Sequence, residues 1–223
     1  MNIIINSIFS KDSILKPLYK SKVTFAKYMF FTVICFSFFG VFTSCQTLKP
    51  SRQIIISRKI ADTGFLSSSQ LAAFFIQENP SYNKKDIQKL AEYYVSESKI
   101  EGINSDVAFA QMCLETGFLR FGGLVQPEWH NYCGLGAIDK ENPGCIFETE
   151  QLGVRAHIQH LQAYATTPDV ELNQELVDPR YSWVHKTKMA YTIEDLTGNW
   201  AADANYDKKI EAILQRMEMF VNK

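Results

Sequence analysis

A single carboxylate at the end of an apolar helical stretch is the residue best suited to acid–base chemistry in this sequence. Residues 110–117 read Ala-Gln-Met-Cys-Leu-Glu-Thr-Gly, so Glu115 stands where a helix gives way to an aromatic-rich loop. Partial burial disfavours the charged form of a carboxyl group and raises its pKa, which keeps a proton available for a departing group. We interpret Glu115 as a candidate general acid; a solvated glutamate near a helix end is the alternative.

The elements expected to position Glu115 are mainly helical. Apolar residues at helical spacing, preceded by capping residues, predict several helices. The helix that ends at Glu115 is apolar on nearly every side, which predicts that it is buried at the centre of the domain. A capping-box-like start is also present at Thr192 to Asp195. The predicted helices run through residues 71–76, 87–95, 106–115, 150–165 and 207–221.

Residues 116–147 break the helical pattern with six glycines and two prolines. This stretch is too irregular for a helix and too long for an idle connection, so we expect it to line a site and to hold a small β-hairpin. The patterns together predict a mainly α fold, α+β in class. In it, a helical domain carries a small irregular or β-hairpin lobe beside the Glu115 helix.

Three cysteines lie beyond the N-terminal region, and an odd number cannot all pair. Cys113 lies in the apolar helix, where we expect a buried thiol. Cys133 and Cys145 flank a turn-rich loop, and an exported protein permits a disulfide between them, with free thiols as the alternative. The sequence contains no Cys-x-x-Cys or His-x-x-x-His spacing, so we expect no metal site. His157 and His160 are expected to be solvated or at the edge of the core.

The first 44 residues have the organisation of an export signal. They hold five lysines and one acidic residue, and the apolar run from Met29 to Thr43 is fifteen residues long. That length is short for a membrane span and typical of the apolar region of a signal peptide. Residues 42–45, Phe-Thr-Ser-Cys, resemble the lipobox of a bacterial lipoprotein, although Phe42 and Thr43 depart from its commoner residues. An ordinary short signal anchor is the alternative.

Cleavage at this lipobox would make Cys45 a lipidated N-terminus. The predicted organisation is then a lipoprotein signal peptide over 1–44, a lipidated tether with a short extended segment over 45–66, and a catalytic domain over 67–223. We expect an exported protein, anchored to a bacterial membrane by acyl chains and facing the periplasm or the cell surface. Gln46 is not an acidic retention signal, so an outer membrane is favoured in a cell with two membranes.

Beyond residue 44 the chain is mildly acidic, with 18 basic and 23 acidic residues. This balance argues against nucleic acid as the main partner. The sequence contains no phosphate-cradling glycine motif and no recognisable Ser-His-Asp signature, so we expect no cofactor. We expect the protein to be a monomer.

Four sequence pieces together point to one enzyme family. They are residues 110–117, residues 131–136 (Asn-Tyr-Cys-Gly-Leu-Gly), residues 153–161 (Gly-Val-Arg-Ala-His-Ile-Gln-His-Leu) and residues 200–210 (Trp-Ala-Ala-Asp-Ala-Asn-Tyr-Asp-Lys-Lys-Ile). In this order they resemble the bacterial peptidoglycan N-acetylglucosaminidases of glycoside hydrolase family 73, also described as endo-β-N-acetylglucosaminidases. The resemblance covers about residues 105–217. Trp200 and Ala202 depart from the family's Tyr-Ala-Thr-Asp-Pro-x-Tyr segment.

The resemblance implies a lysozyme-like fold, with a glycan cleft between a helical lobe and a small β-rich lobe. It implies that Glu115 protonates the glycosidic oxygen after an N-acetylglucosamine unit of peptidoglycan, so that an oxocarbenium-like state forms. Asn131, Tyr132 and Tyr206 would line the cleft, and Trp129 could stack on a sugar face. For each aromatic ring, packing in the core is the alternative.

The sequence leaves a second catalytic carboxylate open. Glycosidases usually use two acids, and the resemblance suggests a second one in the small lobe. Asp139, Glu141, Glu148 and Glu150 are all available there, with Glu141 and Glu148 as our candidates. Assistance by the substrate's own acetamido group, or a tyrosine that positions water, are the alternatives. For the whole protein, the alternatives to hydrolysis are a lytic transglycosylase of related fold and a non-catalytic protein that binds the cell wall.

Overall fold

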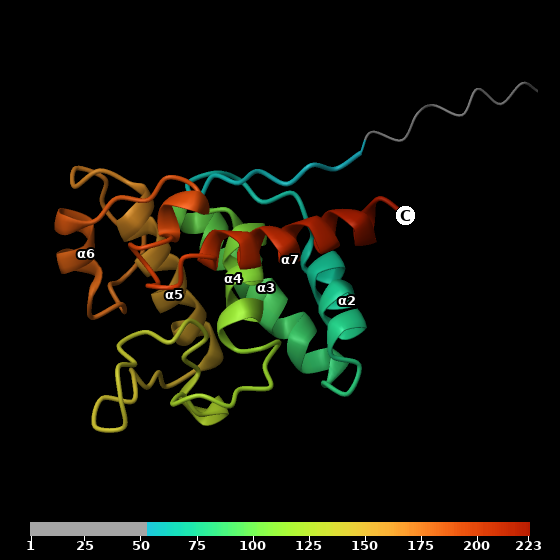
Figure 1. Cartoon of the computed structure of the whole chain (residues 1–223), viewed down its shortest axis with the longest axis horizontal. Coiled ribbons are helices and arrows are strands. Elements are labelled where there is room, and N and C mark those ends of the chain that lie inside the picture. The colour runs from blue at the N-terminus through green and yellow to red at the C-terminus, as the bar shows by residue number, and fades with distance from the viewer. Residues whose placement is uncertain (1–52) are drawn as a thin grey trace, which may run out of the picture. The chain divides into compact units, whose positions relative to one another are not determined.

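The structure, a computed structural model, describes residues 53–223; the predicted signal sequence and Cys45 lie outside this range. The described residues form six α-helices and two short 3₁₀ helices, and one of the six, α4, lies at the centre of the others (Figure 1). The predicted mainly helical fold class is confirmed. None of the described helices is long and apolar enough to cross a membrane. In chain order the elements are α2 (Ser68–Glu78), α3 (Lys84–Glu101), α4 (Ser105–Glu115), η1 (Pro127–Trp129), α5 (Glu150–Ala165), α6 (Tyr181–Thr187), η2 (Glu194–Leu196) and α7 (Tyr206–Val221).

α4 is the central helix, and its burial follows from its apolar sequence. Its N-cap is Asn104, whose side-chain oxygen accepts hydrogen bonds from the backbone amides of Asp106 and Val107. Every residue from Ser105 to Cys113 is buried, with α2, α3, α5 and α7 packed around the helix. Figure 1 shows α7 lying across α4. Because α4 has no solvent-facing side, its C-terminal tip at Glu115 is where it reaches the surface.

α5 packs against α3 and α6 and carries polar side chains into the interior. The expectation that His157 is solvated or at the edge of the core is wrong. His157 is fully buried, and each of its ring nitrogens has a hydrogen-bond partner 3.0 Å away: Tyr94 for Nδ1 and Gln111 for Nε2. A buried polar ring is tolerated when both of its nitrogens have partners. His160 is also buried and lies 2.7 Å from the carboxylate of Asp178.

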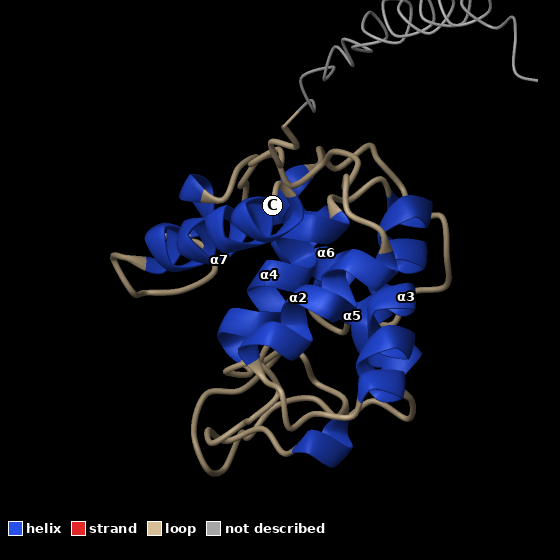
Figure 2. Ribbon diagram, turned by 90° about the vertical axis from the view of Figure 1, so that its right-hand side faces the viewer, coloured by secondary structure: helices blue, strands red, loops and turns tan. Residues whose placement is uncertain are grey.

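The small lobe, residues 116–149, is irregular apart from η1, so of the two predicted forms the irregular one is present and the β-hairpin is not (Figure 2). Within it the described chain forms a single isolated bridge, between Ala137 and Pro143. Pro143 lacks the N–H that would extend the ladder. Three glycines with positive φ also bend the backbone at short intervals: Gly134, Gly136 and Gly144. The thiols of Cys133 and Cys145 are free in this structure, so the disulfide that the sequence leaves open is not formed here.

The segment before α2 packs on the helices. The backbone amide of Ile56 donates to Glu218 of α7 over 2.8 Å, and the side chain of Ile56 is buried. Arg58 bridges Glu211 and Glu218 on the same helix. Part of the segment assigned to the tether is therefore docked on the domain. The helix start predicted at Thr192 is followed only by the short 3₁₀ helix η2. The helix α6 was not predicted from the sequence.

Candidate functional site

Two hydrogen-bond donors hold one carboxyl oxygen of Glu115. Oε1 accepts from the hydroxyl of Tyr206 and, over 3.1 Å, from the indole Nε1 of Trp200. Both donors come from the C-terminal part of the chain, 91 and 85 residues away. No described residue donates to the other oxygen, Oε2, which is therefore free to carry a proton.

The surrounding protein raises the pKa of Glu115 above its ordinary value. Desolvation is the largest cause, while the hydrogen bonds from Tyr206 and Trp200 oppose it by stabilising the charged form. One side of Glu115 is exposed to solvent. The rings of Trp200 and Tyr206 lie against the carboxyl on its other side, and for the pKa the desolvation has a larger effect than the remaining exposure. A carboxyl group that keeps its proton to higher pH than free glutamate, and still faces solvent, is suited to general acid catalysis.

Gln111 sets the direction of the Tyr206 hydroxyl. It lies four residues before Glu115 on α4, so the two side chains share a face of the helix. The side-chain amide of Gln111 donates to the Tyr206 oxygen over 2.7 Å. Because that oxygen accepts from Gln111, the hydroxyl proton is left to point toward Glu115.

His157 in turn sets the orientation of Gln111. The amide nitrogen of Gln111 faces Tyr206, so its oxygen must accept from the His157 Nε2–H, 3.0 Å away. His157 Nδ1 then carries no proton and accepts from the hydroxyl of Tyr94 over 3.0 Å. Burial lowers the pKa of His157 to about 3, which keeps the ring in the neutral form that this arrangement requires. Along the chain Tyr94–His157–Gln111–Tyr206, every donor points toward the carboxyl.

Trp200 is fixed against α5 by aromatic packing. Its ring centroid lies 4.9 Å from that of His160 in an edge-to-face contact, 5.5 Å from Tyr164 and 5.8 Å from His157. This packing aims the indole N–H at Glu115. The sequence marks Trp200 only as a departure from the family's tyrosine and misses its role as a donor. Gln111 and Tyr94 were missed as well, because nothing local distinguishes them from other core residues.

Glu115 faces a cleft of about 250 Å³ between the end of α4 and the small lobe, which we call the Glu115 cleft. Its walls are mainly apolar, and small residues keep part of its floor open. Sugar rings have apolar faces and polar edges, so a mainly apolar cleft with one carboxyl suits a glycan. The lining includes Phe121, Leu124, Val125, Asn131, Gly134 and Ala137.

The turn after Glu115 has an uncommon backbone. Gly117, Phe118 and Leu119 have φ values of 58°, 57° and 56°, and the two non-glycine residues are strained in this left-handed region. The Thr116 hydroxyl holds the turn by donating to the carbonyl of Met112 over 2.7 Å and accepting from the amide of Leu119 over 2.9 Å. The turn bends the chain sharply away from α4, which leaves the Glu115 carboxyl uncovered.

The predicted substrate-binding residues occupy different places. Tyr206 contacts Glu115 directly. Asn131 lines the cleft, but its amide is used within the lobe: it bonds the backbone of Leu135 in both directions and the carbonyl of Cys145. Tyr132 is buried in the main hydrophobic core and does not line the cleft. Trp129, in η1, is half-buried and lies outside the cleft lining too.

The candidate second acids are not among the residues that line the Glu115 cleft. Glu141 and Glu148 are exposed, and neither lines the Glu115 cleft. Asp139 is exposed and accepts backbone hydrogen bonds in a tight turn of the lobe. Glu150 forms an ion pair with Lys89 at 3.0 Å. Among the described residues that line the cleft, Glu115 is the one carboxylate.

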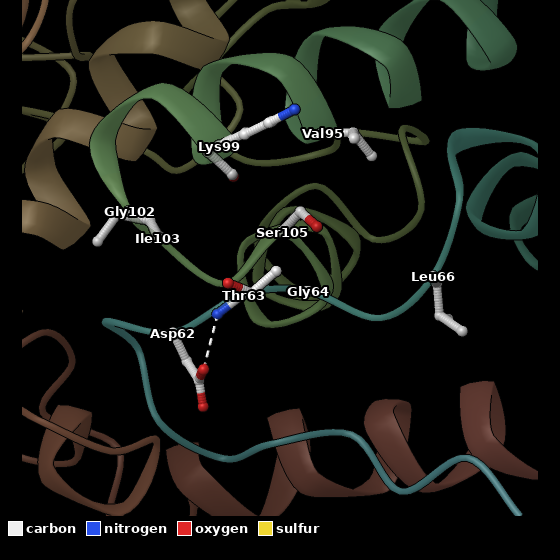
Figure 3. Close-up of a pocket in the computed structure, with 10 residues that line it drawn as sticks. Asp62, Thr63, Gly64, Leu66, Val95, Lys99, Gly102, Ile103 and Ser105 are labelled. Atoms are coloured by element: carbon white, nitrogen blue, oxygen red, sulfur yellow. Dashed lines mark hydrogen bonds between the residues drawn. The ribbon is translucent and has the colours of Figure 1, made fainter.

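A larger cavity, of about 370 Å³, lies at the other end of α4 (Figure 3). Asp62 and Lys99 lie on its walls, and the Asp62 carboxylate accepts a hydrogen bond from the amide of Thr63 over 2.8 Å. Hydrogen bonds lower the pKa of Asp62, so it is not a proton donor near neutral pH. No aromatic residue lines this cavity. The described residues also contain no cluster of three or more groups suited to a metal ion.

Comparisons with known proteins identify the family. A family model described as Glucosaminidase, mannosyl-glycoprotein endo-beta-N-acetylglucosaminidase, matches residues 91–219. The chain is 43% identical over 152 residues to a protein of Borreliella burgdorferi that is described as uncharacterized; the match covers 68% of this chain and 73% of the relative. No solved structure matches the chain. The matched segment contains Glu115, Trp200 and Tyr206, and the chain belongs to the glucosaminidase family of glycoside hydrolases.

Proposed function

We propose that this protein hydrolyses the β-1,4 glycosidic bond after N-acetylglucosamine in peptidoglycan glycan strands, with Glu115 as the general acid. One observation carries the proposal. The carboxyl of Glu115 has a raised pKa, its Oε1 is held by Tyr206 and Trp200, and its Oε2 is free beside a cleft. Membership of the glucosaminidase family supports a glycan substrate.

In the proposed first step, Glu115 Oε2 gives its proton to the glycosidic oxygen. The bond between that oxygen and C1 of N-acetylglucosamine breaks, and its electron pair stays on the oxygen. Glu115 becomes negative as its proton leaves. The hydrogen bonds from Tyr206 and Trp200 are already in place and strengthen as this charge develops, so they stabilise the transition state more than the ground state.

The positive charge at C1 needs an electron pair from a second group. Since Glu115 is the one carboxylate among the described lining residues of the cleft, the acetamido oxygen of the same N-acetylglucosamine suits this role. It would attack C1 to form a cyclic intermediate, which water then opens while passing a proton to the Glu115 carboxylate. These two steps return Glu115 to its protonated form, need only one protein carboxyl group and retain the configuration at C1.

Mass spectrometry of the products released from peptidoglycan sacculi tests this proposal. The purified protein should release fragments that have gained water and end in reducing N-acetylglucosamine. Glu115→Gln should lower the rate by about 10²- to 10⁴-fold, because it removes the proton donor while keeping the shape of the side chain. Pelleting of this variant with sacculi should stay unchanged, since the glycan contacts remain.

A lytic transglycosylase is the second candidate, because its chemistry also needs a single glutamate and the cleft offers one. Its products would be anhydro-muramic ends without added water. Such ends would replace our assignment with the lytic one. Failure of the native protein to release any fragment, with binding intact, would favour a non-catalytic wall-binding protein.

We also propose that the protein is exported and anchored to a membrane through acyl chains on Cys45, with the outer membrane favoured. The support is the order of basic, apolar and small residues before that cysteine. Cells expressing the chain should incorporate a labelled fatty acid into it, and Cys45→Ser should abolish the label. A native chain that takes up no label would contradict the anchor without touching the proposal for Glu115.

A further inference from the structure

A second pocket, of about 240 Å³, adjoins the Glu115 cleft. Trp200, whose indole bonds to Glu115, forms part of its wall. Gly134 and Ala137 line both cavities, so the two are neighbours along the small lobe. A glycan strand bound at Glu115 would therefore place the substituents of its adjacent sugars beside this pocket, which we call the Arg180 pocket.

The lining of the Arg180 pocket includes two cationic side chains beside polar and aromatic ones. Arg180 and Lys188 flank α6, and no aspartate or glutamate is among the lining residues. Neither cation forms an ion pair with a described residue. The guanidinium of Arg180 lies over the half-exposed ring of Trp183, 5.5 Å from its centroid, which orients it without using its N–H donors.

Arg180 differs from the other arginines of the described chain. Arg58, Arg155 and Arg216 pair with carboxylates, and Arg120 donates to backbone carbonyls. Among these five, the guanidinium of Arg180 alone has no hydrogen-bond acceptor within residues 53–223. A guanidinium with free donors, beside a second cation, is a ready site for a carboxylate.

The Arg180 pocket is cationic in a domain whose net charge is negative. Residues 53–223 contain 16 basic and 23 acidic residues, so the surface as a whole repels an anionic polymer. Peptidoglycan is anionic where its muramic acid residues carry a lactyl carboxylate or a peptide with free carboxylates. An acidic enzyme that acts on this polymer gains from a local cationic pocket beside its cleft.

We propose that the Arg180 pocket binds a carboxylate carried by a muramic acid residue next to the cleaved N-acetylglucosamine. The inference rests on the proposed function and narrows its substrate class to strands whose muramic acids bear a carboxylate. Two sources share this chemistry: the lactyl carboxylate itself and the carboxylates of the attached peptide. Arg180 and Lys188 would act by binding and positioning, not by transferring a proton.

The test compares the native protein with the double variant Arg180→Gln, Lys188→Gln on three probes. These are peptide-free strands with free lactyl carboxylates, the same strands after amidation of those carboxylates, and strands that keep their peptides. The double variant should lose about tenfold or more in kcat/KM on a carboxylated probe and stay unchanged on the amidated one. Native kcat/KM on the carboxylated probe should also fall with rising salt.

A matched control removes two other cations. Lys186→Gln with Lys208→Gln changes the net charge equally, on exposed residues that line neither cavity. This control should behave like the native protein on every probe. A loss on peptide-free strands assigns the lactyl carboxylate, and a loss confined to peptide-bearing strands assigns the peptide. Three results would overturn the proposal. The double variant could lose as much kcat/KM on the amidated strands as on the carboxylated ones, it could lose none on any probe, or the control variant could lose kcat/KM as well.

A binding arm separates this inference from the proposed function. Glu115→Gln, with and without the two pocket substitutions, is titrated with the same three probes. If the native protein cleaves nothing while binding of carboxylated strands still depends on Arg180 and Lys188, the pocket stands and the hydrolase proposal fails. If the native protein cleaves strands and binding is indifferent to both cations, the hydrolase stands and the pocket fails.

Discussion

The side-chain amide of Gln111 donates to the hydroxyl of Tyr206 over 2.7 Å, and this contact determines where the Tyr206 proton points. A tyrosine hydroxyl can rotate between acceptors when its oxygen is unpartnered. Here the oxygen is occupied by a donor from α4, so the hydroxyl proton is directed to Glu115 Oε1. Gln111 is thus a positioning residue that acts on the carboxyl through Tyr206.

Gln111→Leu should lower kcat by about tenfold or more and leave KM nearly unchanged. The substitution frees the Tyr206 hydroxyl to turn away from Glu115, which weakens stabilisation of the developing carboxylate and not the binding of the glycan. It also leaves the buried His157 Nε2–H unpaired, at a cost of about 1–3 kcal/mol in the free energy of unfolding. Steady-state kinetics and chemical denaturation measure the two effects.

Gln162→Leu is the matched control for that variant. Gln162 is also buried, and its side-chain oxygen accepts from the Tyr181 hydroxyl over 2.6 Å, far from Glu115 in the hydrogen-bond network. We expect kcat to be preserved and the loss of stability to be smaller than in Gln111→Leu, because the buried side-chain nitrogen of Gln162 has no hydrogen-bond partner among the described residues and its removal relieves that cost. Equal losses of kcat in both variants would mean that Gln111 matters only for folding.

His157 should make the protein less stable below neutral pH. Its pKa is about 3 when folded, because of burial, and near 6.5 when unfolded, so the unfolded state binds more protons between these values. The contribution of His157 to the free energy of unfolding is therefore fully present above about pH 6.5 and is lost as the pH falls below that value. Between pH 6.5 and 4.5 this one group removes about 2 kcal/mol from the free energy of unfolding.

Denaturant titrations across that pH range check this prediction in His157→Gln, which cannot take up the proton. The variant should show a flatter pH dependence than the native protein by about that amount, whatever its stability at pH 7. A native-like slope in His157→Gln would mean that other groups cause the acid sensitivity.

Glu141→Gln and Glu148→Gln should each keep activity within about twofold of the native protein. Both side chains are exposed and neither lines the Glu115 cleft, so each substitution changes only a solvated charge. Initial rates on sacculi, with Glu115→Gln beside them as the inactive reference, measure this. A drop of a hundredfold or more in either variant would identify a second catalytic carboxylate and exclude the substrate-assisted route.

The helices were predictable from the sequence because their signals are local. The capping residues that the sequence shows before the first three helices are the observed N-caps: Ser67 for α2, Asn83 for α3 and Asn104 for α4. The helix apolar on all sides is indeed the central one, and Glu115 ends it. α6 was missed because it is only seven residues long and lies in a stretch without strong helical periodicity.

The candidate site was only partly predictable, because its contacts join residues distant in sequence. Tyr206 could be named from the family resemblance, yet its partner Gln111 is 95 residues away and has no local signature. The β-hairpin predicted in the small lobe is absent for a related reason. Closely spaced glycines indicate turns, but pairing of the flanking segments into strands depends on tertiary contacts. Asn131 holds that lobe by bonding the backbone of Leu135 and Cys145, which a substrate-binding interpretation did not anticipate.

Trp200→Phe should move the alkaline limb of the pH–activity profile to higher pH. The indole N–H donates to Glu115 Oε1 and lowers the pKa of the carboxyl, against the larger upward effect of desolvation. Phenylalanine keeps an aromatic ring against His160 and Tyr164 but has no donor, so the pKa of Glu115 rises further and the acid form persists to higher pH. kcat should also fall, by up to about tenfold, since the developing carboxylate loses one hydrogen bond.

The pH dependence of kcat/KM on peptidoglycan strands measures this shift, because it reports the ionisation of the free enzyme. Tyr164→Phe is the control: it removes a hydroxyl that bonds the backbone of Asn199, beside Trp200 but not in contact with Glu115. Its profile should coincide with the native one. An alkaline limb that stays fixed in Trp200→Phe would show that a group other than Glu115 loses the proton that controls the rate.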